Sequence, residues 1–146
     1  MALDLSQSWL KQAEHDLEVA AHLRSKGYFD WACFAAQQAA EKALKSVRTC
    51  LGCVPKALMT HDLGRLADRL PGLTCNDDRQ RRERFAALAS HEGNARYPGA
   101  AGEDIGVPPC ERYDDPMAEG AVEEATKIVD ECRKLRLKIE ESGSTV

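Results

Sequence analysis

The sequence predicts an all-α protein, an antiparallel up-and-down bundle of four long helices and one short helix. Apolar residues recur at three- and four-residue steps, which is the period of one helical face. No stretch shows the alternation typical of a strand, and only 5% of the residues are aromatic. The 146 residues, 43% of them hydrophobic, fit one domain with an ordinary core. We therefore expect residues 1–146 to form a single domain with its core at about 7–141 and a disordered tail at 142–146.

The first two helices are predicted at about 7–25 and 30–50. Gly27 ends the first helix, and Asp30 is a good N-cap for the second. The second helix has a wide apolar arc rich in alanine, as expected of the central helix of a bundle. We expect its polar stripe to face away from this arc, with Glu41 and Lys45 forming an i,i+4 pair. The stripe consists of Gln37, Gln38, Glu41, Lys42 and Lys45.

Residues 51–59 contain glycine and proline and predict a loop. Thr60 is expected to cap a short helix that ends before Pro71 and Gly72, with His61 in its first turn. The cluster Asn76, Asp77 and Asp78 predicts the start of a fourth helix, because side-chain oxygens and negative charge suit a helix N-terminus.

Residues 93–116 hold four glycines and four prolines and predict a long irregular crossing. Loops of this length in compact domains are often functional. The last helix follows, with Asp115 as its cap and Pro116 at its first position.

Composition limits the classes of function. A formal net charge of −4 argues against a large, positively charged surface that binds nucleic acid, so any such contact is expected to be local. The sequence lacks a long apolar run and a signal-peptide pattern, which indicates a cytoplasmic protein with no membrane contact.

The six cysteines are scattered and are interpreted as reduced thiols, with Cys33 and Cys132 at apolar helical positions. The lone pair Cys50 and Cys53 lacks further ligands, so we expect no metal and no cofactor. Neither a nucleophile-elbow serine nor a Gly-rich phosphate loop is present in the sequence.

Four segments resemble the HEPN family, the higher eukaryote and prokaryote nucleotide-binding proteins. They are WLKQAEHDLEVA at 9–20, YFDWACFAAQQAAEKALK at 28–45, THDL at 60–63 and NARYP at 94–98. The resemblance covers roughly residues 7–137 and independently implies a helical bundle. It also implies a choice of activities, since family members are nucleotide-binding modules, partners of minimal nucleotidyltransferases or ribonuclease toxins.

Arg84 and His91 have the spacing of the Arg and His that ribonuclease members of the family carry for charge stabilisation and acid/base catalysis. The match is imperfect, because Phe85 stands where a small polar residue is usual. Alternatively, Arg84 is a solvated charge on the outer face of an arginine-rich helix. His91 is then a cation near the helix C-terminus.

Arg96 and Tyr97 are the preferred ligand-binding candidates. A loop arginine can hold a phosphate, and a neighbouring ring can stack on a base. Asn94 belongs to the same segment, and Lys42 and Lys45 would line a shared cleft if the loop folded back across the second helix. Alternatively, Arg96 pairs with Asp16 or Glu41 inside the bundle, Tyr97 plugs its end and Pro98 stiffens the turn.

The leading hypothesis is a non-catalytic HEPN module that forms a homodimer through helix faces and binds a nucleotide or RNA near Arg96 and Tyr97. A ribonuclease toxin that uses Arg84 and His91, without a metal, is the first alternative. The second is a structural partner of a nucleotidyltransferase-like protein or a larger assembly.

Overall fold

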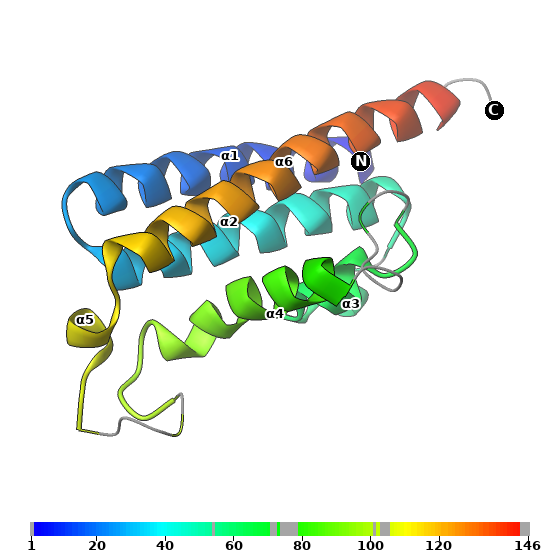
Figure 1. Cartoon of the computed structure of the whole chain (residues 1–146). Coiled ribbons are helices and arrows are strands. Elements are labelled where there is room, and N and C mark those ends of the chain that lie inside the picture. The colour runs from blue at the N-terminus through cyan, green and yellow to red at the C-terminus, as the bar shows by residue number, and fades with distance from the viewer. Residues whose placement is uncertain are drawn as a thin grey trace.

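Four long helices build the computed structural model of this chain (Figure 1), which describes residues 2–53, 55–70, 73, 79–100, 102 and 106–143. They are α1 (Ala2–Ser25), α2 (Phe29–Cys50), α4 (Arg79–Asn94) and α6 (Asp115–Gly143). A 3₁₀ turn η1 (Pro55–Leu58) and the short helices α3 (Leu63–Ala67) and α5 (Pro109–Arg112) lie between them. Helices α1 and α4 run one way and α2 and α6 the other. The predicted all-helical class is confirmed, and the described residues contain no strand.

Helix α2 is the centre of the bundle. It contacts α1, α6, α4, α3 and α5. Its small side chains are fully buried, which lets neighbouring backbones approach closely. These buried alanines are Ala32, Ala36, Ala39, Ala40 and Ala43.

Larger apolar side chains from the other helices fill the space around α2. The core includes Leu63, Phe85, Leu88, Ile128 and Val129. Burial of such side chains supplies most of the favourable free energy of folding. Within the described residues, no helix combines the length and the hydrophobicity needed to cross a bilayer.

The starts of the first two helices differ from the prediction. Helix α1 begins at Ala2 rather than at about Gln7. Tyr28, not Asp30, occupies the N-cap position of α2 and provides no side-chain cap. Asp30 instead lies in the first turn, where its negative charge suits the helix dipole. Gly27 adopts a φ of 84° in the turn after α1, a conformation that favours glycine.

The short helix α3 is capped by Asp62 rather than by Thr60. The backbone N–H of Arg65 donates to Asp62 Oδ1 over 3.1 Å, while Thr60 Oγ1 accepts from the Asp62 N–H at 3.2 Å. His61 therefore lies before α3 and not in its first turn. The predicted start of the fourth helix at 76–78 lies outside the described residues.

The predicted crossing is more ordered than the sequence suggests. Helix α4 continues to Asn94, and the one-turn helix α5 follows Pro108. Asp114, not Asp115, caps α6, since its Oδ1 accepts from the Met117 N–H at 3.0 Å. Helix α6 ends at Gly143, so residues 142 and 143 of the predicted tail are helical, and 144–146 lie outside the described residues.

Candidate functional site

Arg96 and Tyr97 directly follow the end of α4. Both backbone N–H groups donate to the carbonyl of Gly93, at 3.1 and 3.2 Å. The guanidinium carbon of Arg96 lies 4.5 Å from the ring centre of Phe34 on α2 and 4.9 Å from that of Tyr97. At these distances the cation is attracted by both ring faces. The contact joins the end of α4 to the first half of α2.

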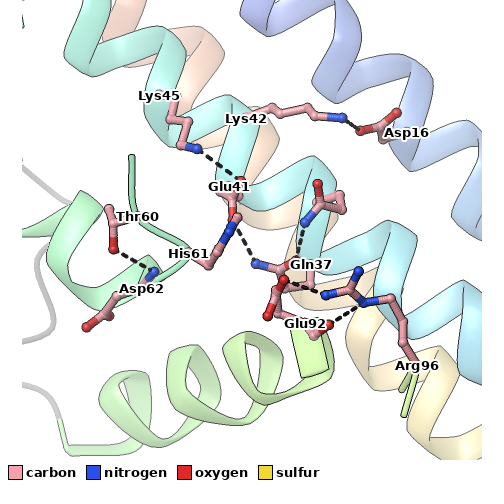
Figure 2. A network of polar contacts seen from close by, with 11 residues as sticks. Asp16, Gln37, Glu41, Lys42, Lys45, Thr60, His61, Asp62, Glu92 and Arg96 are labelled. Atoms are coloured by element: carbon pink, nitrogen blue, oxygen red, sulfur yellow. Dashed lines mark hydrogen bonds and ion pairs between the residues drawn. The ribbon is translucent and has the colours of Figure 1, made fainter. Parts of the chain in front are cut away.

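Glu92 fixes the edge of the Arg96 guanidinium, as Figure 2 shows. Nε donates to the Glu92 carbonyl and one terminal nitrogen donates to its carboxylate, both at 2.6 Å. The alternative pairing of Arg96 with Asp16 or Glu41 is therefore wrong. Glu92, four residues before Arg96, is closer in the sequence than either of them.

Two aromatic residues of α2 that were not among the predicted site residues extend this surface. The ring centres of Trp31 and Phe34 are 5.9 Å apart in an edge-to-face arrangement. Trp31 is 49% exposed and Tyr97 is 56% exposed, so Tyr97 does not plug the bundle. We call Trp31, Phe34, Arg96 and Tyr97 the aromatic shelf. The signal that could have revealed it is the i,i+3 pair of large rings on a helix otherwise rich in alanine.

The structure does not bring the two lysines to the shelf. Lys42 Nζ lies 2.5 Å from Asp16 Oδ2 on α1, and Lys45 Nζ lies 3.1 Å from Glu41 Oε2 (Figure 2). The predicted i,i+4 pair of Glu41 and Lys45 is thus confirmed. Asn94 lies close in sequence to Arg96, and its backbone carbonyl accepts a hydrogen bond from Arg112 at 3.0 Å.

The polar stripe of α2 is largely buried. Glu41 is only 3% exposed, and Gln37 is fully buried. Three donors meet the Glu41 carboxylate: the Gln37 amide at 3.2 Å, the Lys45 ammonium, and His61 Nδ1 at 2.8 Å. These contacts compensate the cost of burying the charge. Glu41 therefore faces the segment that carries His61, whereas Lys42 reaches Asp16 on α1.

Arg84 and His91 line one groove of about 490 Å³ between α4 and α6. Arg84 Nε lies 3.3 Å from Glu124 Oε2, and the Arg84 side chain remains 46% exposed. His91 Nδ1 lies 2.8 Å from the Tyr113 hydroxyl, and the two rings pack edge to face. We call this the α4–α6 groove. Its other walls include Leu88, Met117, Gly120 and Ala121.

Burial controls the protonation of His91 and of its hydrogen-bond partner Tyr113. It lowers the pKa of His91 to about 4 and raises the pKa of Tyr113 to about 12. Both groups are therefore uncharged at neutral pH. The alternative interpretation of His91 as a helix C-terminal cation is wrong for this reason.

The cysteines in the described part of the chain are free thiols. Cys33 and Cys132 are fully buried, as their apolar positions predict. Burial raises the pKa of Cys33 to about 12 and that of Cys132 further, which makes both thiols unreactive. Among the described residues, no three histidine, cysteine or acidic side chains gather in a way that could hold a metal ion.

Comparisons with known proteins agree with the helical architecture. A family model of the HEPN domain matches residues 6–135. The protein TT1696 from Thermus thermophilus is 32% identical, with a TM-score of 0.76 over 89% of this chain and 97% of its own. ST0689, an archaeal HEPN homologue, is 28% identical, with a TM-score of 0.70 over 90% of this chain and 97% of its own. No curated protein matches the sequence.

Proposed function

The chain belongs to the HEPN family, and from this membership together with the aromatic shelf we propose that it binds a nucleotide, either free or within an RNA strand. The observation that supports the proposal most is the contact of Arg96 with the rings of Phe34 and Tyr97. This contact places the Arg96 cation beside the exposed ring of Tyr97. Bases stack on such rings, and phosphates bind such cations.

Each group of the shelf has a distinct part in the proposed complex. The exposed rings of Tyr97 and Trp31 offer stacking faces to a base. Glu92 occupies Nε and one terminal nitrogen of Arg96, while the other terminal nitrogen has no hydrogen bond within the described residues and can donate to a phosphate oxygen. The site is local, as a chain with net charge −4 requires.

Calorimetric titration of ATP, GTP and a short single-stranded RNA into the wild type and Arg96→Ala tests the proposal. We expect at least one of the three to bind the wild type and to lose about tenfold or more in affinity in the variant, since charge-assisted contacts contribute about 1.5–3 kcal/mol. Arg133→Ala is the matched control, because Arg133 is also paired with carboxylates but lies on α6. Equal affinity of wild type and Arg96→Ala, or no binding to either, defeats the proposal.

A ribonuclease is the second candidate function, because Arg84 and His91 line the same groove. A neutral His91 is able to accept a proton, and Arg84 can stabilise phosphate charge if it leaves Glu124. We expect such an enzyme to arrest growth when expressed and to cleave RNA without a metal, and to lose both effects in Arg84→Ala and His91→Ala. Absence of growth arrest and of cleavage in the wild type removes this candidate.

Homodimerisation and pairing with a nucleotidyltransferase-like protein remain predictions. The predicted pairing is tested by co-expressing this chain with a nucleotidyltransferase-like protein and purifying one of the two proteins through an affinity tag. A stable heteromer is the expected result for a paired system, and separate elution of the two proteins contradicts it.

A further inference from the structure

His61 forms a carboxylate–imidazole pair with Glu41. Nδ1 of the ring lies 2.8 Å from Glu41 Oε1. An ionised carboxylate only accepts hydrogen bonds, so Nδ1 carries the proton of the neutral ring. The second ring nitrogen, Nε2, is then left as an acceptor.

The pair holds an exposed ring in a fixed position. The His61 side chain is 61% exposed, whereas the Glu41 carboxylate beneath it is buried and also held by Gln37 and Lys45. The segment that carries His61 is fixed by the Asp62 cap of α3 and the bond to Thr60. No described residue bonds to Nε2. The buried groups therefore direct one free acceptor toward solvent.

The ring and the aromatic shelf open on the same side of α2. Phe34, which supports Arg96, and Glu41, which holds His61, are seven residues apart. Seven residues are almost two complete turns, so both side chains lie on one face, about 10 Å apart along the axis. Figure 2 shows His61 and Arg96 beside the part of α2 that carries Glu41 and Gln37, with the side chains of Gln37 and Glu92 drawn between them. The separation is comparable with the length of one nucleotide.

We propose that His61 Nε2 accepts a hydrogen bond from a ribose hydroxyl of the nucleotide stacked on the aromatic shelf. Glu41 is the positioning residue, because it fixes the tautomer and the direction of the ring. The contact makes the chain bind ribonucleotides more tightly than nucleotides whose sugar lacks the hydroxyls. This inference rests on the proposed nucleotide-binding function.

Titration of ATP and 2′,3′-dideoxy-ATP at about pH 8, where imidazole is generally neutral, tests the contact. We expect the wild type to bind ATP about three- to tenfold more tightly than the dideoxy analogue, the effect of one hydrogen bond. His61→Ala should bind both equally, with its affinity for the analogue unchanged. His15→Ala, which alters an exposed histidine of α1, should keep the wild-type preference.

Two further variants separate the inference from the function on which it rests. Tyr97→Ala should weaken the binding of both nucleotides and leave the ratio of their affinities unchanged. In nitrogen NMR spectra, the wild-type His61 ring should be protonated on Nδ1, and Glu41→Gln should give a mixture of tautomers. Binding of ATP that depends on Tyr97 but shows no preference, or the same preference in His61→Ala, overturns the inference alone. Absence of binding by ATP, GTP and the single-stranded RNA alike, or ATP binding unaffected by Tyr97→Ala and by Arg96→Ala, overturns both.

Discussion

The aromatic shelf and the α4–α6 groove each combine an arginine with an aromatic ring, yet they differ in what they leave exposed. On the shelf, Arg96 lies against Phe34 and Tyr97, and the outer rings face solvent. In the groove, Arg84 pairs with Glu124, and His91 bonds to Tyr113. The shelf thus leaves aromatic rings exposed to solvent, whereas Arg84 and His91 of the groove have polar partners within the protein.

The difference shows that the same residue types acquire opposite properties from their surroundings. Burial removes the charge that His91 would carry as an ordinary exposed histidine at low pH. Exposure leaves the ring of Tyr97 available for stacking. Sequence spacing linked Arg84 with His91, and both line one groove, but spacing contains no information about burial.

The largest expected contrast is in stability and concerns two carboxylates. Glu41 is buried beneath His61, and Glu124 pairs with Arg84 in the groove. Glu41→Ala leaves the buried ammonium of Lys45 without its partner and should lower the free energy of unfolding by about 3–5 kcal/mol. Glu124→Ala removes a partner from the half-exposed Arg84 and should cost about 1 kcal/mol or less. Urea unfolding of both variants measures the contrast. Equal losses of unfolding free energy in the two variants would contradict a buried polar centre around Glu41.

Acidification should act on the groove. Burial lowers the pKa of folded His91 to about 4, against 6.5 for the ordinary group. As the pH falls from 6.5 towards 4, His91 binds a proton in the unfolded chain but not in the folded chain. Folding stability therefore decreases, by up to about 3 kcal/mol. His91→Gln should lose less stability than the wild type between about pH 7 and pH 4.5, measured by urea unfolding.

The exposed His15 provides the control for this pH dependence. His15→Gln should follow the wild-type curve, because it removes a histidine from the surface of α1 without changing the groove. Parallel loss of stability in the wild type and His91→Gln would show that His91 titrates normally.

Replacement of the exposed shelf ring should affect binding more than folding. Tyr97→Ala removes a stacking face, and we expect about tenfold weaker binding of ATP, as calorimetry can measure. The free energy of unfolding should change by about 0.5 kcal/mol or less, since the ring is 56% exposed. Leu137→Ala, at a similarly exposed position of α6, should leave the affinity unchanged. Full affinity in Tyr97→Ala would argue against stacking on the shelf.

The smallest effect is expected from Arg84→Ala. Its ion pair with Glu124 is partly exposed, so we expect a change of about 0.5 kcal/mol in stability and no change in ATP affinity. Thermal unfolding and calorimetry measure the two quantities. A loss of ATP affinity as large as that in Arg96→Ala would place the ligand in the groove.

Much of the fold could be predicted because helical periodicity and a wide apolar arc on α2 specify a central helix. Helix ends were less predictable, since Asp62 and Asp114 compete with neighbouring Thr60 and Asp115 for the same capping positions. The contacts of Arg96 with Phe34 and of His61 with Glu41 depend on distances across the bundle, which a single sequence does not contain. Phe34 was missed as a shelf residue because an apolar residue at a helical position is usually core.

An NMR titration with ATP compares the two regions most directly. If the shelf binds the nucleotide, the largest shifts of backbone amide signals occur at Phe34, Arg96 and Tyr97, while Met117, Gly120 and Glu124 in the groove stay nearly unchanged. Large shifts confined to the groove residues, with the shelf signals unmoved, would contradict the account.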